Sequence, residues 1–271
     1  MGIINATPDS FSDGAELQMS GANSFQLDLS KALSRAEAML ADGATFIDVG
    51  GESTRPGAVV VSEQEELDRV IPIVEAIRAR LDVCISVDTS SPIVMEQAIN
   101  GGAELINDVR ALSTPGAIEV VSASKAAVCL MHMQGTPNTM QKDVSNSSYE
   151  SVVQEVFRFL KARVEDCLGN GIERSRLLID PGFGFGKTVQ HNYLLLKNLA
   201  HLSGLAIPIL VGVSRKSMIG EVTGRAVDQR LAGSIAATTF ALASGAKIIR
   251  THDVAATMDA IRVNSAYSSA E

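Results

Sequence analysis

Eight short apolar runs divide this 271-residue sequence, and nearly every run ends in a residue that can hydrogen-bond, carry charge or bind metal. Between successive runs there is room for a crossover, usually a helix, which is the sequence form of repeated βα units. Eight such units close into a barrel whose active site lies at the C-terminal ends of its strands. We therefore expect the polar residues that end the runs to converge. They are Asn5, Asp48, Asp88, Asn107, His132, Asp180, Ser214 and the pair Arg250 and His252.

Length and composition fit one α/β domain, a (β/α)8 TIM barrel. Such a barrel typically takes about 250 residues. A barrel over residues 1–263 leaves only a polar tail at 264–271, which we expect to fray. Hydrophobic residues make up 46% of the chain and charged residues 20%, so the chain can bury a large core and differs from disordered sequences.

Charge and segment patterns exclude several classes of protein. The sequence contains no run of 18 apolar residues and no basic segment leading into an apolar one, so we expect a cytoplasmic protein without a membrane span. A net charge of −8 without a Lys/Arg stripe argues against nucleic-acid binding. Cys84, Cys129 and Cys167 show no CxxC pairing, so neither a disulfide framework nor a zinc site is expected.

Several segments between the runs have helical periodicity. Apolar residues recur at helical spacing between Leu29 and Leu40, and Gly43 follows as a stop signal. Ser62 and Glu65 form a capping box before a second amphipathic segment. Further helices are expected from Pro92 to Ala98, Val152 to Leu168, Leu194 to Leu202 and Leu231 to Ala243.

Four longer loops follow the first, second, sixth and seventh runs, at residues 5–14, 50–57, 180–187 and 214–217. Glycines in them let the backbone approach a ligand closely, and exposed phenylalanines such as Phe183 and Phe185 offer flat apolar faces. A single Gly-rich turn is a weak signal. Four such loops on one barrel rim indicate a functional site.

The motifs of these loops and strand ends resemble the dihydropteroate synthase family, enzymes of the folate pathway. The runs, in order, are GIINATPDSFSDG, DVGGESTRPG, SVDT, INDV, IDPGFGFGK, GVSRKS and RTHD. The resemblance implies a pterin-binding TIM barrel that condenses 6-hydroxymethyl-7,8-dihydropterin pyrophosphate with p-aminobenzoate, in the presence of Mg²⁺, to give dihydropteroate and pyrophosphate. It also implies a homodimer and inhibition by sulfonamides, which mimic p-aminobenzoate.

The pterin ring needs a carboxylate or an amide in its plane, because its edge alternates donors and acceptors. Asp88, Asn107 and Asp180 at strand ends could supply these groups, although a strand-end Asp or Asn often only caps the next helix. We favour a functional role for these three, and the capping role for Asp48. The resemblance assigns Asp88, Asn107 and Asp180 to the pterin, and adds Lys216 and Thr54 to the site of the pterin pyrophosphate.

Positive charge is needed where pyrophosphate departs. Arg250 and His252 alternate on the eighth strand, which places both side chains on one side, and Asn5 lies on the neighbouring first strand of a closed barrel. The resemblance implies that Asn5 is a magnesium ligand and that Arg250 and His252 bind the diphosphate. It also places Thr251 in the binding site of the pterin pyrophosphate.

The pterin ring can stabilise a cation at the carbon under attack, so the leaving group can depart before the amine attacks in an SN1-like reaction. No covalent nucleophile is then required, and the sequence has no GxSxG elbow. Catalysis would rest on electrostatic stabilisation and positioning. The resemblance gives the p-aminobenzoate pocket six residues: Phe11, Thr54, Pro56, Phe185, Lys216 and Ser217.

Two mobile loops carry opposite charges at Asp13 and Arg55, and a salt bridge between them would latch a closed site that excludes water. The other reading is two solvated charges. We expect structural roles for His132 and for four cations outside the motif assignments. These cations are Lys187, Arg215, Arg225 and Arg230.

Two alternatives come from other functional classes. A related barrel that transfers methyl groups from methyltetrahydrofolate would share the pterin residues, but it has no use for a diphosphate grip. A non-catalytic pterin-binding paralogue would not need Asn5, Lys216, Arg250 and His252. One departure from the family pattern is that the first strand begins at Gly2, so the usual N-terminal hairpin is missing or encoded upstream.

Overall fold

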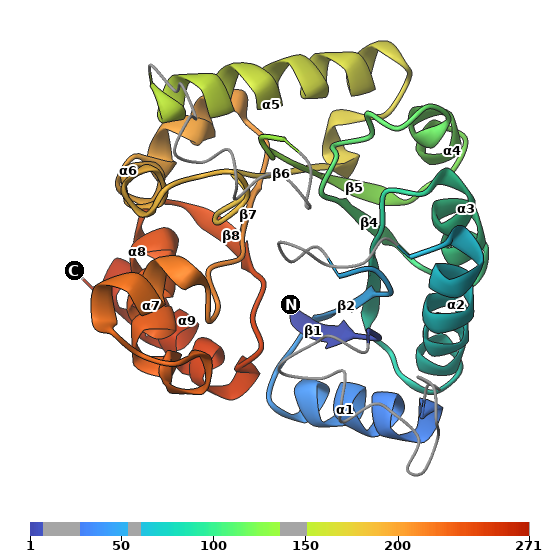
Figure 1. Cartoon of the computed structure of the whole chain (residues 1–271), viewed down its shortest axis with the longest axis horizontal. Helices are drawn as coiled ribbons and strands as arrows, with labels where there is room; N and C mark the ends of the chain where they lie inside the picture. The colour runs from blue at the N-terminus through green and yellow to red at the C-terminus, as the bar shows by residue number, and fades with distance from the viewer. Residues whose placement is uncertain (8–27, 54–60, 136–150, 271) are drawn as a thin grey trace.

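The strands form one parallel sheet that curls into a barrel. The computed structural model describes residues 1–7, 28–53, 61–135 and 151–270. The sheet has eight strands in the order β1 to β8, each paired in parallel with the next. Beside β8, Met1 N donates to Ile249 O at 3.0 Å and Thr251 N donates to Met1 O at 3.0 Å, and Gly2 bridges to Thr251. These contacts join the last strand to the first, and helices surround the ring (Figure 1). The expected TIM barrel is confirmed.

Each apolar run of the sequence is a strand. The exact ends differ at five of them. Strand β2 continues two residues past Asp48, β4 continues one residue past Asn107, and β7 ends three residues before Ser214. Strands β5 and β8 each end one residue before the polar residue, His132 and Arg250 respectively. The strands are β1 (Gly2–Asn5), β2 (Phe46–Gly50), β3 (Cys84–Asp88), β4 (Leu105–Asp108), β5 (Ala127–Met131), β6 (Leu177–Asp180), β7 (Ile209–Val211) and β8 (Ala246–Ile249).

The helices lie in the segments between strands. The capping box before α2 is present, with Ser62 N donating to Glu65 Oε2 at 3.1 Å and Glu65 N donating to Ser62 Oγ at 3.3 Å. The α-helices are α1 (Leu29–Ala41), α2 (Glu63–Arg80), α3 (Pro92–Asn100), α4 (Ala117–Ser122), α5 (Val152–Gly169), α6 (Val189–Lys197), α7 (Ser217–Thr223), α8 (Leu231–Ala243) and α9 (Val254–Ser268). The 3₁₀ helices are η2 (Arg174–Arg176), η3 (Leu199–Leu205) and η4 (Val227–Gln229).

Two expectations about helices need correction. The segment expected as one helix from Leu194 to Leu202 is divided between α6 and η3. The polar tail at 264–271 does not fray from its start, because α9 continues to Ser268. In the described ranges, the helices lack the combination of length and apolarity that crossing a membrane requires.

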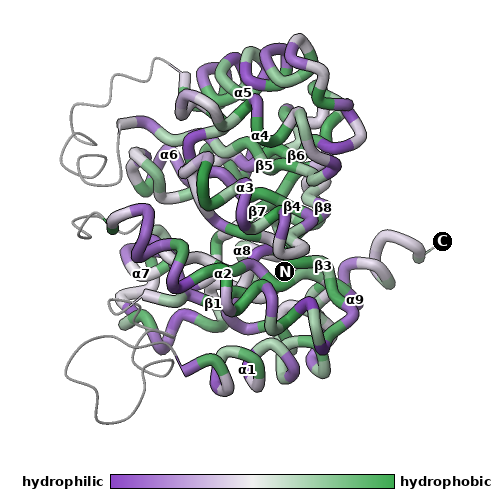
Figure 2. Tube along the Cα trace, turned by 90° about the vertical axis from the view of Figure 1, so that its right-hand side faces the viewer, coloured by the Kyte–Doolittle hydropathy of each residue, from purple (hydrophilic) through white to green (hydrophobic). Residues whose placement is uncertain are grey.

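A large apolar core fills the space between the helices and the sheet, and the tube view shows apolar strands inside helices of mixed polarity (Figure 2). A second, smaller cluster contains Leu105 and Leu210, with Phe46, Leu178 and Ile248 packed against it. Four of these five residues come from the even strands β2, β4, β6 and β8. In barrels of this type, alternate strands contribute the side chains of one interior layer. This cluster is therefore the apolar floor of the barrel interior.

The next interior layer along the same four strands is polar. Side chains two positions apart on a strand point to the same face. Two positions after Phe46, Leu105, Leu178 and Ile248, the chain places residues that carry charge or an amide. They are Asp48, Asn107, Asp180 and Arg250. We call these four residues the polar layer. Because this layer lies directly above the apolar floor, its four side chains meet inside the barrel.

Candidate active site at the mouth of the barrel

Arg250, a member of the polar layer, binds one carboxylate of that layer and one carboxylate on strand β3. Its Nε donates to Asp48 Oδ2 at 2.6 Å, and its Nη2 donates to Asp88 Oδ2 at 3.0 Å. The side chain of Asp48 is fully buried, and that of Arg250 is 21% exposed. These two bonds use two of the five N–H groups of a guanidinium. Arg250 therefore pairs with two carboxylates while keeping further donors for a ligand.

Asp48 does not have the capping role that the sequence favoured. The N-cap of α2 is Ser62, and Asp48 lies inside the barrel in the middle of β2. Besides Arg250, its carboxylate accepts hydrogen bonds from Ser86 Oγ at 2.5 Å and from Asn107 Nδ2 at 3.3 Å. The signal that identifies it is its spacing of two from Phe46, the same spacing that relates Asn107 to Leu105. Asp48 thus orients a predicted pterin residue and a predicted diphosphate residue.

The predicted pterin residues lie together. Asp88 and Asn107 are register partners on β3 and β4, and Asn107 and Asp180 are both buried. Burial raises the pKa of Asp88 to about 7, against the opposing effect of Arg250. Burial also raises the pKa of Asp180, opposed by Lys216 and by the amide of Gly182, which donates to Asp180 Oδ1 at 2.7 Å. Both carboxyl groups are therefore sensitive to a ligand that brings charge or donors.

Lys216 faces the loop between β6 and α6. Its Nζ donates to Phe183 O and lies 4.6 Å from the ring centroid of Phe185, within the range of a cation–π contact. Burial lowers the pKa of Lys216 to about 8, although Asp180 acts to raise it. Phe185 is partly buried, as a ring that offers a face to a ligand should be, whereas Phe183 is fully buried and was wrongly expected to be exposed. Ser217, the first residue of α7, is exposed.

His252 contacts Ser214 through both its backbone and its ring. Ser214 Oγ accepts from the backbone N of His252 at 3.2 Å and lies 3.1 Å from His252 Nδ1. The Ser214 hydroxyl can donate to Nδ1, which leaves the ring proton on Nε2, or its oxygen can accept from a protonated Nδ1. Burial, with a further effect from Arg250, lowers the pKa of His252 to about 3. His252 is therefore a neutral imidazole, and it is a donor through Nε2 in the tautomer in which Ser214 donates to Nδ1.

Arg250 and His252 were expected on one side of the eighth strand; β8 itself ends at Ile249, and an isolated parallel bridge between Gly2 and Thr251 follows it. Arg250 points to Asp48 and His252 to Ser214. The side-chain oxygen of Thr251 accepts from Asp253 N at 3.1 Å and from Thr257 Oγ1 at 2.9 Å. Thr251 is buried and lies in the turn before α9, and its predicted place in the substrate site stays a prediction.

The four cations without assigned roles lie around this site. Arg215 forms an ion pair with Asp253, its Nε donating to Oδ2 at 3.0 Å, and its backbone has a left-handed φ of 56°. Arg230 Nη1 donates to Arg215 O at 3.0 Å, and Arg225 is exposed. Arg215 and Arg230 thus have the structural roles expected of them. Lys187 is buried and bonds three backbone carbonyls.

Asn5 lies at the end of β1 beside Asp88. A Cβ built on Gly50 would lie 3.9 Å from Asn5 Oδ1 and 3.5 Å from Asp88 Cβ, so all three residues are neighbours at the mouth. Within the described ranges, no three His, Cys, Asp or Glu residues are grouped so that they could hold a metal ion. Magnesium is commonly held by one or two protein oxygens together with substrate phosphates and water. The residues present fit that kind of magnesium site and do not fit an all-protein cage.

Five predicted site residues lie outside the described residues. They are Phe11, Asp13, Thr54, Arg55 and Pro56. The proposed latch between Asp13 and Arg55 and half of the predicted p-aminobenzoate pocket therefore stay predictions.

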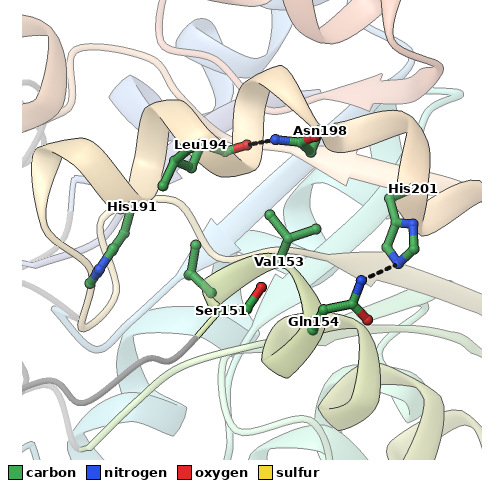
Figure 3. A pocket seen from close by; sticks show the side chains of 8 residues that line it. Ser151, Val153, Gln154, His191, Leu194, Asn198 and His201 are labelled. Carbon is green, nitrogen blue, oxygen red and sulfur yellow. Dashed lines mark hydrogen bonds between the residues drawn. The ribbon is translucent and has the colours of Figure 1, made fainter.

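A surface pocket of about 440 Å³ lies outside the barrel wall, between the start of α5, helix α6 and η3 (Figure 3). Its lining includes His191, Leu194 and His201, and Gln154 Nε2 lies 3.4 Å from His201 Nε2. None of the predicted site residues lines it. The convergent charges of the barrel mouth, and not this pocket, identify the candidate active site.

Comparison with known proteins decides the family. A family model described as a pterin binding enzyme matches residues 1–252. The dihydropteroate synthase of Haemophilus influenzae is 54% identical over 270 residues, covering 100% of this chain and 94% of that protein. The chain belongs to the dihydropteroate synthase family.

Solved structures of the family agree with the barrel. The Yersinia pestis dihydropteroate synthase with a sulfonamide drug complex has a TM-score of 0.92 and 49% identity, covering 100% of this chain and 94% of that one. The Xanthomonas albilineans dihydropteroate synthase with 4-aminobenzoic acid has a TM-score of 0.89 and 46% identity, with coverage of 100% and 93%. At these identities the likeness extends beyond the fold to the family itself.

The Arg250 network predicts a pH-dependent loss of stability in Arg250→Met. This change leaves the buried carboxylates of Asp48 and Asp88 without their cation, which should lower the free energy of unfolding by about 3–5 kcal/mol at pH 8. At pH 5 the loss should be smaller, because Asp88, whose pKa is about 7, is then protonated. Urea unfolding at both pH values measures the difference.

The control for this experiment is Arg262→Met, because Arg262 pairs with Asp259 in an exposed ion pair at 3.0 Å. Exposed pairs contribute little to stability. Equal effects of the two substitutions, or a loss that grows at pH 5, would contradict a charged network at the centre of the barrel.

Proposed function

We propose that the barrel mouth condenses 6-hydroxymethyl-7,8-dihydropterin pyrophosphate with p-aminobenzoate to give 7,8-dihydropteroate and pyrophosphate. The observation that carries the proposal is the convergence of Asp88, Lys216 and the polar layer in a member of the dihydropteroate synthase family. The ligands of the family structures, a sulfonamide and 4-aminobenzoic acid, support the choice of the second substrate.

The pterin edge is assigned to Asp88, Asn107 and Asp180. The two carboxylates accept from ring N–H groups, and the amide of Asn107 supplies both a donor and an acceptor. Asn107 is fixed by its bond to Asp48, so its orientation is set before the pterin binds. Ionised carboxylates beside the ring stabilise the positive charge that the pterin develops in the reaction.

The diphosphate is assigned to Arg250 and His252. Arg250 offers the N–H groups not used by Asp48 and Asp88, and His252 offers its Nε2–H. The C–O bond to the diphosphate breaks first, and pyrophosphate leaves with the electron pair. The amine of p-aminobenzoate then forms the C–N bond and releases a proton. The protein positions the groups and stabilises charge, and no covalent intermediate with the protein forms.

The amine side of the site is assigned to Phe185, Lys216 and Ser217. The Phe185 ring and the Lys216 stem offer apolar surface to the aromatic ring of the substrate, while the ammonium and the exposed Ser217 hydroxyl can bind its carboxylate. Phe11, Thr54 and Pro56 complete this pocket in the proposal.

Magnesium is the proposed cofactor, with Asn5 as its protein ligand and the diphosphate as the other partner. When bound, it would neutralise charge on the leaving group. A cytoplasmic location is also part of the proposal, supported by three cysteines that are all free.

The first test is turnover. With Mg²⁺ and both substrates, the purified protein should release pyrophosphate only when p-aminobenzoate is present, and a sulfonamide should compete with p-aminobenzoate. Pyrophosphate release that does not depend on p-aminobenzoate would contradict the proposal. Methyl transfer from methyltetrahydrofolate would instead support the methyltransferase alternative.

The pKa of Lys216 predicts the alkaline limb of the pH profile. Its ammonium is charged below about pH 8 and is lost as the pH rises through that value, so kcat/KM for p-aminobenzoate should fall above pH 8. In Lys216→Arg the rate at pH 7 should be lower, but this limb should disappear because a guanidinium stays charged. A limb near pH 8 that persists in the variant would exclude Lys216 as its origin.

We further propose that the enzyme is a homodimer. Exposed apolar side chains gather in the consecutive segments α7, η4 and α8, at Val222, Val227, Leu231 and Phe240, the last 63% exposed. Light scattering should give about twice the 28.6 kDa of one chain, and Phe240→Asp should shift the population to monomers. A monomeric wild-type protein at micromolar concentration would contradict the proposal.

A further inference from the structure

Lys187 ends the glycine-rich loop between β6 and α6 and is only 3% exposed. Lysines are rarely buried to this degree unless they are paired. Here the ammonium group donates to three backbone oxygens, to His132 O at 3.2 Å, Gly182 O at 2.8 Å and Phe185 O at 3.0 Å. The lysine thus bonds to the backbone of two different segments at the mouth of the barrel.

The number of acceptors matches the protonated form of the lysine. An ammonium group has three N–H donors, whereas a neutral amine has two and would direct a lone pair at the third carbonyl. Burial lowers the pKa of Lys187, with Lys216 acting in the same direction and Asp180 in the opposite one. The three carbonyl dipoles oppose the effect of burial, because hydrogen bonds from the ammonium group favour its charged form.

The loop held by Lys187 is pressed against the end of β5. Gly182 and Gly186 have left-handed backbones, with φ of 68° and 65°. A Cβ on Gly182 would collide with the carbonyl of His132, and one on Gly186 would lie 2.5 Å from Gln134 O. Backbone packed this closely turns carbonyl oxygens inward, where an unbonded oxygen is costly. Lys187 donates hydrogen bonds to three carbonyl oxygens of this contact, those of His132, Gly182 and Phe185.

The same loop forms one wall of the amine side of the proposed site. Phe183 O accepts from Lys216 Nζ, and the Phe185 ring faces that ammonium group. Lys187 bonds the carbonyl of Phe185 itself, and Gly184 N donates to Asn192 Oδ1 at 2.7 Å, which anchors the loop to α6. Phe185 is thus held by two bonds, one from its own N to Gly182 O at 3.2 Å and one from Lys187 to its carbonyl oxygen.

We propose that Lys187 is a positioning residue for the amine substrate: by bonding His132 O, Gly182 O and Phe185 O together, it sets the Phe185 ring and the Phe183 carbonyl against Lys216. This inference rests on the proposed function, because Phe185 and Lys216 face p-aminobenzoate only under that assignment. Lys187 itself does not touch the reacting atoms.

The strands limit the effect to one substrate. Asp88 and Asn107 lie on β3 and β4, away from this loop, and Asp180 is the last residue of β6. Loss of the Lys187 ammonium should therefore loosen the loop beyond Asp180 while Asp88 and Asn107 stay in place. Asp180 accepts from Gly182 N of that loop, so a small change in pterin binding is expected through this residue.

The test replaces Lys187 with Met, which keeps the length of the side chain and removes its donors. KM for p-aminobenzoate should rise at least about tenfold, the worth of one charge-assisted hydrogen bond. The Kd of 6-hydroxymethylpterin pyrophosphate with Mg²⁺, measured by calorimetry without the amine, should stay within about twofold. The matched control is Lys197→Met on the exposed end of α6, which should change neither value.

If Lys187 had a purely structural role, its replacement would reduce the fraction of active protein, so the apparent kcat would fall while KM for p-aminobenzoate stayed unchanged. That result would overturn the inference. If Lys187→Met does not fold, Lys187→Arg decides. Its planar guanidinium keeps the charge but cannot gather three carbonyls around one nitrogen, so KM for p-aminobenzoate should again rise, and an unchanged KM contradicts the inference. Absence of turnover in the wild-type protein would refute the proposed function, a separate outcome.

Discussion

The ion pairs of Arg250 with Asp48 and Asp88 are the interaction on which the site depends. The guanidinium comes from beyond β8 and reaches carboxylates on β2 and β3, at 2.6 Å and 3.0 Å, across the inside of the barrel. A buried carboxylate without a cation would be costly, and so would a buried guanidinium without carboxylates. Each charge therefore makes the burial of the others possible. The barrel can keep a charged interior at the end where a polar ligand enters.

The position of this network follows from the alternation of side chains along the strands. Apolar side chains of the even strands close the floor, and the residues two positions later form the polar layer above it. The floor excludes water from one side, which explains why burial dominates the pKa shifts of Asp88, Asp180 and Lys216. Groups whose charge is sensitive to their surroundings are suited to a reaction that develops opposite charges on a ring and a leaving group.

The strands and the polar residues at or near their ends were predictable from the sequence, because apolar runs and their polar ends are local patterns, whereas the residues of the p-aminobenzoate pocket came from the family resemblance. Asp48 was misjudged for a physical reason: β2 continues past it, so it is an interior residue rather than a strand end. The role of Lys187 was not predictable, because its three acceptors come from two segments, and their approach depends on the left-handed glycines of the folded loop. The tautomer of His252 likewise depends on Ser214, 38 residues away.

The most direct test of the account is a crystal structure of the protein with a pterin diphosphate analogue bound. In this complex the pterin edge should lie within hydrogen-bond distance of Asp88, Asn107 and Asp180, at the level of the polar layer. Asp48 should still accept from Arg250, while the remaining N–H groups of Arg250 bind the diphosphate. A pterin bound away from these residues, or Arg250 released from Asp48 in the complex, would contradict it.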